Sequence, residues 1–574
     1  MGSARPFDRP LHRRTVLRGA AALAAAGFAG EAFTLPAAAA TIPAPPSFPA
    51  GIELYQQAYV NWSGEIDLAD VWTCAPATPA DVVTVANWAR ANGYRVRPKG
   101  MSHGWAPTLL PAGADVTKVV LVDLTKHLRG ISVGSGRVTV QAGATIDQLT
   151  VALENAGYGL AALTAPGNLT VGGVLAIGAH GSAVPANGET RIPGTSYGTL
   201  SNLVLSLTVV AWDATAGAYV LKTYTRTQPQ IAAFLVHLGR AFVVSAVLQV
   251  GANTRLRCQS FYDIPTATLF AAPGTSGRTI ESYLARSGRI EAIWFPFTDR
   301  PWLKVWTIAP SKPVLSRSVS APYAYTFANF LSEEQSDFLS RIVAGDTSGT
   351  PAFENFQISV VGSGLIVTGT WDIWGWSKNL LLYVQPTTLR IVEAGYAVLT
   401  SRANVQRVIH EFYVRYQARI SAYQAQGKFP MNGPVEIRVT GVDTPADVSG
   451  GGVSPQLSAA RPRPDRPDWN AVVWLDMGTI PGTPDADSFY AEMESWIVAN
   501  YSGDYATVRP EWSKAWAVTP AGAWTDTAAL TGRIPAALRA GQPAGDNWDT
   551  ARATLNAADP HRIFSNTFLD TLLP

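Results

Sequence analysis

Two glycine-rich loops carry the residue types best suited to holding a phosphate-bearing ligand. The first is RPKGMSHGWAP over residues 97–107, and the second is TAPGNLTVGGVLAIGAHGS over residues 164–182. Because glycine has no side chain, backbone N–H groups in such loops can approach a pyrophosphate closely. Either loop alone is equally well explained by a tight structural turn. Two of them in one region favour a cofactor that contains phosphate.

A second set of polar residues lies in later, mostly apolar segments. Glu436 and Arg438 stand two apart in VEIRV, so in a strand their side chains point to the same face. Lys514 follows in RPEWSK, and Glu291 lies in RIEAIWFP. A carboxylate can accept a proton, and a neighbouring cation can stabilise negative charge beside it. On spacing alone, a surface ion-pair ladder remains an equally open interpretation.

Alternating helix and strand patterns surround the two loops. The run from Thr78 to Gly93 predicts a helix with a threonine N-cap, a proline in the first turn and a terminal glycine. A second helix is expected after Thr145, and a hairpin over residues 131–143. These patterns predict an α+β domain over residues 50–255.

The composition changes after this domain. Residues 256–530 are rich in Trp, Phe and Tyr, and they mix strands with helical runs such as residues 404–427. Residues 444–469 are rich in Pro, Gly and Ser, which predicts a long loop. The final run, DPHRIFSNTFLDTLLP, is compact and apolar, and it is expected to dock on another part of the protein.

The first forty residues have the pattern of a targeting segment. Arg13 and Arg14 precede an apolar, alanine-rich run over residues 19–30, and small residues follow. The apolar run is too short to cross a membrane. We predict a twin-arginine signal over residues 1–40 and an extracytoplasmic mature protein; an ordinary secretory signal or a membrane anchor are the alternatives. Because this route exports folded proteins, it is compatible with a cofactor-containing enzyme.

Several classes of function lack support in the sequence. The 44 basic and 42 acidic residues nearly cancel, which does not favour nucleic-acid binding. Two cysteines, Cys74 and Cys258, allow at most one disulfide and no four-cysteine zinc site, and the seven histidines form no metal-binding motif. The G-x-S-x-G match at residues 194–198 lacks the strand and helix that a hydrolase needs. No dinucleotide-binding strand–GxGxxG–helix unit is present, and no further segment is long and apolar enough to span a membrane.

Taken together, the two loops, the run LGRAFVVSAVLQV and the C-terminal DPHRIFSNTFLDTLL resemble the vanillyl-alcohol oxidase / p-cresol methylhydroxylase flavoproteins. The resemblance implies a two-subdomain FAD-binding domain over residues 50–255 that is distinct from the Rossmann fold. It further implies a substrate-binding cap over residues 256–530, built on an antiparallel sheet flanked by helices. Residues 531–574 would then return to the FAD-binding domain.

The same resemblance implies which residues hold FAD. His103 occupies the position that many members bond covalently to the flavin, whereas no cysteine between residues 164 and 184 could form a second bond. The implied cofactor-binding residues, besides His103, are Pro98, Lys99, Gly100, Met101, Ser102, Gly104, Pro166, Gly167, Asn168, Gly172, Gly173, Gly178, His180, Gly181, Val243 and Asn566.

The E-x-R strand and the RP-x-W-x-K segment resemble those of aldonolactone and alditol oxidases. By this resemblance Glu436 is the proton acceptor, Arg438 an electrostatic stabiliser and Lys514 a polar partner. Glu291 is a second carboxylate in a W-F-P strand, and it could pair with Arg438 as a gate.

The large aromatic cap resembles that of the bacterial type II cholesterol oxidases, which carry covalent FAD. This implies oxidation of a sterol 3β-hydroxyl with O2 to give H2O2, isomerisation to the Δ4-3-ketone, and transient contact with a lipid surface. A polyol or aldonolactone oxidase, a non-catalytic flavin- or sterol-binding protein, and a dehydrogenase that does not use O2 remain alternatives. No metal and no nucleic-acid partner are expected.

Overall fold

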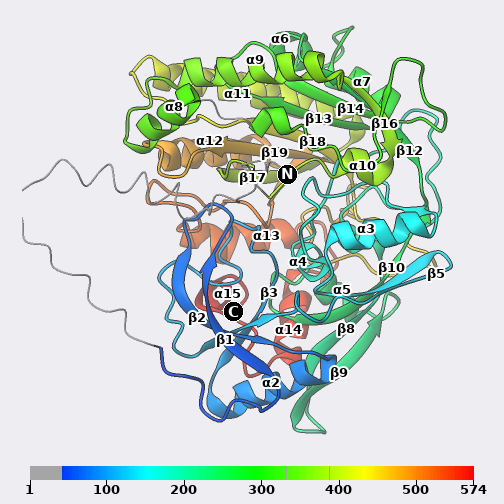
Figure 1. Cartoon of the computed structure of the whole chain (residues 1–574), viewed down its shortest axis with the longest axis vertical. Coiled ribbons are helices and arrows are strands. Elements are labelled where there is room, and N and C mark those ends of the chain that lie inside the picture. Colours follow the sequence, from blue (N-terminus) through cyan, green and yellow to red (C-terminus); the bar gives the residue numbers. More distant parts are fainter. Residues whose placement is uncertain (1–41, 330–332, 387) are drawn as a thin grey trace, which may run out of the picture.

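The computed structural model describes residues 42–329, 333–386 and 388–574, so the predicted export signal lies outside the described residues. The chain forms two halves that share one large hydrophobic core cluster (Figure 1). The lower half in this view contains a four-stranded and a five-stranded sheet, and the upper half contains a nine-stranded sheet. Within the described parts of the chain, no helix is long and apolar enough to cross a membrane.

The four-stranded sheet positions the first glycine-rich loop. Its strands, in spatial order, are β1 (Glu53–Val60), β2 (Asp67–Ala75), β4 (Val119–Asp123) and β3 (Arg95–Lys99). Helix α2 (Pro79–Asn92) precedes β3, and its predicted ends are confirmed: the Thr78 side chain accepts from the backbone N–H of Asp81, and Gly93 adopts φ +66°. The first loop begins within the last residues of β3 and continues beyond Lys99.

The five-stranded sheet supports the second loop. Its strands, in spatial order, are β5 (Ile131–Gly134), β6 (Arg137–Gln141), β10 (Phe242–Gln249), β8 (Val204–Asp213) and β9 (Ala218–Thr225). The predicted hairpin is confirmed as β5–β6, and the predicted helix as α3 (Ile146–Asn155), which Thr145 caps. In the second loop, Thr170 caps the short helix α4 (Val171–Ala176).

The nine-stranded sheet forms the centre of the upper half. Its strands, in spatial order, are β15 (Arg317–Ser318), β16 (Asp372–Trp376), β12 (Arg255–Phe261), β14 (Trp302–Ile308), β13 (Arg289–Trp294), β18 (Val435–Gly441), β19 (Ala471–Thr479), β17 (Val392–Thr400) and β20 (Ala506–Pro510). All neighbouring strands in this described sheet pair antiparallel except β15 and β16, which are parallel.

Helices flank this sheet, and one of its faces is turned toward the lower half. Helices α9 (Thr350–Thr368), α11 (Val405–Gln424) and α12 (Ala486–Asn500) lie in the upper half of Figure 1. Every residue of β13, β17 and β19 is buried, as expected for strands that are covered on both faces. The antiparallel sheet with flanking helices is therefore confirmed.

The C-terminal segment packs into the lower half, where α14 (Trp548–Ala558) and α15 (Thr567–Leu572) appear in red (Figure 1). Asp559, which is 1% exposed, accepts hydrogen bonds from the Tyr219 hydroxyl at 2.6 Å, from Arg240 Nη1 at 2.9 Å and from two backbone N–H groups. The buried Arg97 of β3 donates to the carbonyl oxygen of Phe564. The C-terminal segment therefore connects the four-stranded sheet, through Arg97, with the five-stranded sheet, through Tyr219.

We predict that Asp559→Ala lowers the free energy of unfolding by about 3–5 kcal/mol, because it leaves Arg240 buried without its counter-charge. The matched control is Asp549→Ala, since this aspartate forms an ion pair with Arg539 in which the two side chains are 45% and 41% exposed. Loss of such an exposed pair costs about 0–1 kcal/mol. Denaturant melts of the holoprotein would measure both, and equal losses would contradict the structural role given to Asp559.

Candidate active site

A cavity of about 500 Å³ lies between the two halves and is lined by residues from both. The predicted cofactor residues that line it are His103, Pro98, Lys99, Gly100, Met101, Ser102, Gly104, Pro166, Gly172, Gly173, Gly178, His180, Gly181 and Val243. The nine-stranded sheet and the segment after β20 contribute Glu436, Arg438 and Lys514 to the same lining. The structure thus brings together motifs that are more than 400 residues apart, as His103 and Lys514 are.

Three of the predicted cofactor residues do not line the cavity: Gly167, Asn168 and Asn566. Gly167 faces Asp147, whose carboxyl oxygen would lie 2.0 Å from an added Cβ. Asn566 instead caps α15 and donates its amide to the carbonyl oxygens of residues 107, 108 and 109. Its contribution is therefore to hold the end of the first loop.

The two glycine-rich loops contact each other at Gly100. A Cβ there would lie 2.4 Å from Thr170 Oγ1, and a Cβ on Gly172 would lie 3.0 Å from the Cβ of Ala142. Glycine is required for this close approach, since any side chain would force the loops apart. The two loops therefore form one cradle rather than two separate turns, which fits a phosphate-bearing group.

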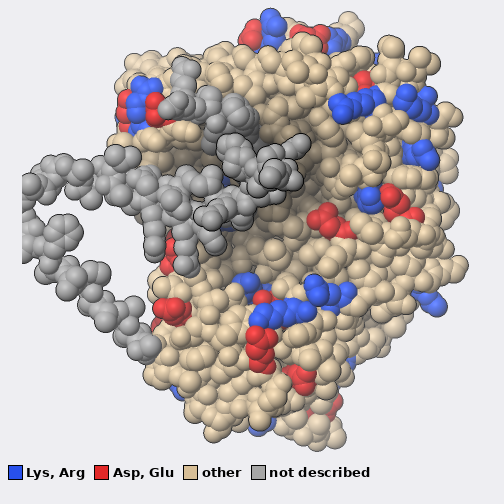
Figure 2. Space-filling model, in the orientation of Figure 1, with Lys and Arg blue, Asp and Glu red and all other residues tan. Residues whose placement is uncertain are grey.

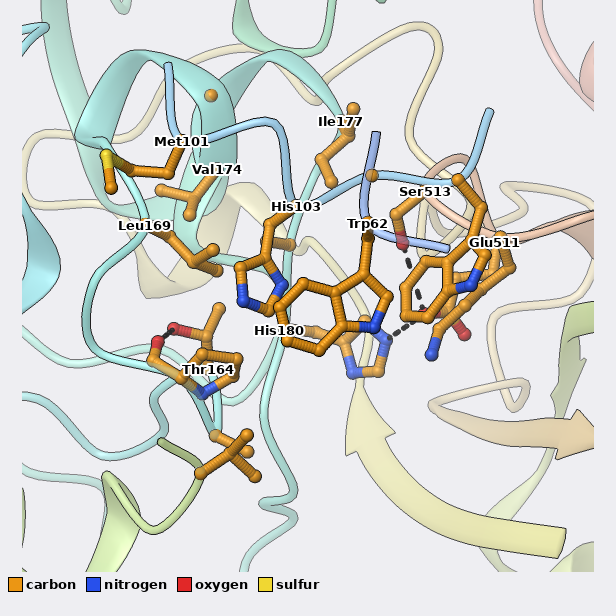
Figure 3. A pocket seen from close by; sticks show the side chains of 18 of the residues that line it. Trp62, Met101, His103, Thr164, Leu169, Val174, Ile177, His180, Glu511 and Ser513 are labelled. Carbon is orange, nitrogen blue, oxygen red and sulfur yellow. Dashed lines mark hydrogen bonds and ion pairs between the residues drawn. The ribbon is translucent and has the colours of Figure 1, made fainter. Parts of the chain in front are cut away.

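His103 lies in this cradle, stacked on Trp62 with ring centroids 3.7 Å apart (Figure 3). Its Nε2 atom is buried and has no hydrogen-bond partner among the described residues. Burial, followed by the positive charges of Lys514 and Arg390, lowers the pKa of His103 to about 4. The ring is therefore neutral at neutral pH, so a nitrogen lone pair is available for bond formation.

His237 is a cavity residue that the sequence interpretation missed. Its Nδ1 accepts from the backbone N–H groups of Gly239 at 3.2 Å and Ala241 at 3.4 Å, so the proton of the neutral ring is on Nε2. That Nε2 donor is buried and lacks a partner among the described residues. Burial, followed by the charge of Arg97, lowers the pKa of His237 to about 3. A neutral donor left unpaired in the cavity wall fits an acceptor on a bound cofactor.

On the opposite wall, Arg438 forms ion pairs with three carboxylates, one each from β13, β18 and β19. Its Nη2 lies 2.6 Å from Glu291 Oε1 and 2.5 Å from Glu436 Oε2, and its Nη1 lies 3.1 Å from Asp476 Oδ2. Strand register causes this convergence, because Arg438 pairs with Glu291 across β13–β18 and Glu436 pairs with Asp476 across β18–β19. The Arg438 and Glu436 side chains are only 14% and 19% exposed, so this is not a surface ladder.

Glu291 and Glu436 differ in their access to the cavity. Glu436 lines it, whereas Glu291 is 1% exposed and lies behind Arg438. Tyr383 donates its hydroxyl to Glu291 at 2.6 Å, and Lys304 Nζ lies 3.4 Å from the other carboxylate oxygen. Burial raises the pKa of Glu291, but Arg438 and Lys304 outweigh burial and lower it below its usual value. Glu291 is therefore a fixed anion, and Glu436 is the glutamate that a ligand can reach.

Lys514 belongs to a second part of the cluster. It forms an ion pair with Glu393 and lies 4.1 Å from the centroid of the Trp105 ring. Gly395 makes room for it, since a Cβ there would lie 2.6 Å from both Lys514 Cγ and Asp476 Oδ1. Asp476, Glu393 and Gly395 were not predicted, because only the pairing of β17 with β19 brings them together.

The carboxyl groups outnumber the lysine and arginine cations in this cluster. Among the described residues, five carboxyl groups lie in this cluster with three such cations, Lys304, Arg438 and Lys514; the carboxyl groups are those of Glu291, Glu393, Glu436, Asp476 and Glu511. Burial, followed by the charge of Glu511, raises the pKa of Asp476 well above its usual value. Burial and the neighbouring Glu511 thus favour the protonated form of Asp476.

Glu511 links this acid to the second glycine-rich loop. Burial raises its pKa, but His180 and Lys514 outweigh burial and lower it to about 2. His180 Nε2 lies 3.5 Å from Glu511 Oε1, and the His180 ring stacks on Trp474 at 3.5 Å (Figure 3). A continuous polar path thus runs from Arg438 through Asp476 and Glu511 to His180.

These walls define what the site can do. One wall is a glycine cradle with unpaired histidine nitrogen atoms, and the other carries a carboxylate beside a fixed guanidinium. A hydroxyl compound bound between them could lose its proton to Glu436 and its hydride to a cofactor in the cradle. Among the described residues, no group of three or more His, Cys, Asp or Glu side chains is arranged so that it could hold a metal ion.

Comparisons with known proteins agree with this arrangement. Residues 255–574 match the family described as "Cholesterol oxidase, substrate-binding", and residues 72–216 match the family described as "FAD binding domain". A solved solvent-stable cholesterol oxidase is 55% identical and has a TM-score of 0.91; the match covers 92% of this chain and 100% of that one. A cholesterol oxidase from B. sterolicum is 49% identical, with a TM-score of 0.92 and coverage of 93% and 100%.

More distant proteins share part of the chain. L-gulonolactone oxidase from Bos taurus is 24% identical over 244 residues, which is 42% of this chain. The chain spans about half the length of this relative, namely 49%.

We predict that Asp476→Asn changes the free energy of unfolding by less than about 1 kcal/mol, because an amide can still donate to Glu511 and accept from Arg438. Asp476→Ala leaves both partners short of a hydrogen bond and should cost about 1–3 kcal/mol. The control is Asp372→Asn, since Arg257 binds both oxygen atoms of that carboxylate and an amide cannot replace them. Thermal melts check this order; a loss for Asp476→Asn as large as for Asp372→Asn would mean that Asp476 is ionised.

Proposed function

Because the chain belongs to the family of FAD-dependent cholesterol oxidases, we propose that it oxidises the 3β-hydroxyl group of cholesterol and related sterols. Residues 50–255 and 531–574 would form the FAD-binding part, and residues 256–530 the substrate-binding part. The observation that carries this proposal is a single cavity that His103 and Glu436 line from opposite halves.

The residues of the cradle fit FAD. The glycines of the two loops carry no side chains that would keep a pyrophosphate away from the backbone N–H groups. His237 Nε2 adds a hydrogen-bond donor that has no partner among the described residues. When bound, FAD supplies the acceptor for the substrate hydride. The neutral His103 ring, with Nε2 unpartnered, supports a covalent bond between this histidine and the flavin. No cysteine lies between residues 164 and 184, so we propose one covalent bond only.

Glu436 is our candidate for the proton acceptor. It lines the cavity and contacts Arg438, whose guanidinium can stabilise negative charge on the sterol oxygen as the proton leaves. Glu291 holds Arg438 from behind, and Lys514 is held by Glu393 at the same wall. The same cavity-lining carboxylate could carry the proton between ring carbons during isomerisation to the Δ4-3-ketone, since Glu291 does not line the cavity.

The remaining lining favours a sterol over a sugar. Large apolar and aromatic side chains cover the wall of the upper half, and they include Ile293, Phe295, Trp302, Trp306, Tyr325, Val361 and Leu381. Binding of a fused-ring hydrocarbon to such a surface is favourable because apolar surface is removed from water. A polyol bound there would lose its hydrogen bonds to water without replacing them. We further propose that O2 reoxidises the cofactor to give H2O2 and that the protein is exported through its N-terminal signal.

We predict that Glu436→Gln lowers kcat for cholesterol in detergent by about 10²–10⁴-fold, the usual contribution of a positioned base. The amide fills the same volume but cannot accept the hydroxyl proton. Anaerobic bleaching of the flavin absorbance by cholesterol measures this step directly. Glu492→Gln is a surface control, since its partner Arg419 lies on α11, outside the cavity. Undiminished bleaching in Glu436→Gln would remove this glutamate from the mechanism.

We predict that His103→Ala releases the flavin from the protein when the enzyme is precipitated with acid, whereas the wild-type precipitate stays yellow. The substitution removes the ring nitrogen while leaving the glycine cradle, so flavin should still bind noncovalently. Absorbance of the supernatant and of the pellet separates the two cases. A wild-type pellet without colour would contradict the covalent bond but not the flavin site.

A further inference from the structure

Met101 differs from the other methionines of the described chain in its access to solvent. It is 45% exposed, whereas Met431, Met477 and Met493 are 0% exposed and belong to the main hydrophobic core cluster. A thioether reacts with a dissolved oxidant only where the oxidant can reach the sulfur atom, so the fold protects the three buried methionines. Among the described methionines, Met101 is therefore the one whose sulfur atom is open to attack.

Met101 also lies at the wall of the cavity. It belongs to the first glycine-rich loop, two residues before His103, and it lines the same cavity as Glu436. Figure 2 shows the surface hollowed between the two halves, both of which line this cavity. Figure 3 shows the Met101 side chain beside Val174 and Leu169 in the cradle. The thioether is therefore within reach of a small molecule that is released in the cradle.

The backbone on both sides of Met101 is fixed in place. On one side, Gly100 lies against Thr170, since a Cβ at Gly100 would be 2.4 Å from Thr170 Oγ1. On the other side, Ser102 has φ +56°, a left-handed conformation that is uncommon for a residue with a side chain. Such a conformation persists only where the surrounding contacts determine it. The loop therefore holds Met101 at the cavity wall and does not withdraw it into the core.

The two cysteines do not compete with Met101 for an oxidant. Cys74 and Cys258 are 0% exposed, and burial raises the pKa of each thiol to about 12. The thiolate is the form of cysteine that is readily oxidised, so thiols that stay protonated in the core are inert. Within the part of the chain that the structure describes, oxidation of sulfur is therefore expected first at Met101.

We propose that Met101 is a modification site, at which hydrogen peroxide converts the thioether to methionine sulfoxide. The sulfur atom attacks one oxygen atom of H2O2, the O–O bond breaks, and the second oxygen atom leaves as water with both protons. Sulfur loses two electrons and the peroxide gains them. The inference rests on the proposed function for the source of the oxidant, because reoxidation of the cofactor by O2 releases H2O2 in the same cavity.

The modification changes the polarity of the cradle. A sulfoxide is polar, whereas the thioether that it replaces is apolar. The sulfoxide oxygen would stand beside the apolar side chains of Val174 and Leu169, in a loop that also carries His103. Oxidation of Met101 is therefore expected to slow turnover, so that the enzyme loses activity as its own product accumulates.

The first experiment tests the reactivity of Met101 without turnover. The holoenzyme is treated with reagent H2O2 in the absence of sterol, and mass spectrometry of proteolytic peptides follows the gain of one oxygen atom at each methionine. Met101 should be oxidised at least about tenfold faster than Met431, Met477 and Met493, because attack on these three requires the core to open. Equal rates at the four positions, or no oxidation of Met101, would overturn the proposal.

The second experiment follows the holoenzyme during turnover of cholesterol in detergent under air. Sulfoxide at Met101 should accumulate while the rate declines, and added catalase should suppress both changes. The variant Met101→Leu has a side chain of similar volume without sulfur, so its rate, relative to its own initial rate, should decline at least about threefold more slowly. The matched control is Met493→Leu, which replaces a buried methionine of α12 and should decline like the wild type.

The two experiments separate this proposal from the proposed function. A holoenzyme that does not oxidise cholesterol would overturn the proposed function, while reagent H2O2 would still decide whether Met101 is the modification site. If Met101→Leu loses activity during turnover as fast as the wild type and Met493→Leu, the loss belongs to another group and the role given to the sulfoxide is wrong.

Discussion

A guanidinium at the wall of a largely apolar cavity must be matched by negative charge, and Arg438 sets the arrangement around it. Its three carboxylate partners come from β13, β18 and β19, so the match depends on the register of the sheet. A slip by one residue would turn Arg438 to the other face of β18. The geometry of the site is therefore a property of the sheet, and the central strands carry both the core and the chemistry.

The same charge requirement explains groups that do no chemistry themselves. Glu291 is held by Tyr383 and Lys304, and in turn it fixes Arg438 from the side away from the cavity. Asp476 fits because Gly395 leaves space for its carboxyl group and because burial and Glu511 raise its pKa, which favours the uncharged form. Removal of one member of such a buried network lowers the stability of the fold by more than that member's own interactions contribute, because its partners are left as buried charges without a counter-charge.

Local patterns in the sequence were enough to predict the helix after Thr78, the hairpin at residues 131–143, the long loop and the flavin loops, because each depends on caps, glycines or a period of two. The partners that need strand pairing could not be predicted: Asp476 and Glu393 meet Lys514 only through the β17–β19 ladder. His237 gave no signal, since a lone histidine in the run LVHLGR matches no motif. Asn566, which the resemblance predicts as a cofactor residue, does not line the cavity; it caps α15 and donates to the end of the first loop.

The docking of the C-terminal segment has a consequence for the order of events during synthesis. Arg97, at the entrance to the first glycine-rich loop, is bonded to Phe564, which is 467 residues later in the chain. Asn566 holds the end of the same loop. While the ribosome is still making the intervening residues, the loop lacks these contacts. No interaction with the C-terminal segment then offsets the conformational entropy that the loop loses when it becomes ordered. Stable loading of a cofactor into the cradle therefore follows, rather than accompanies, translation of the preceding domain.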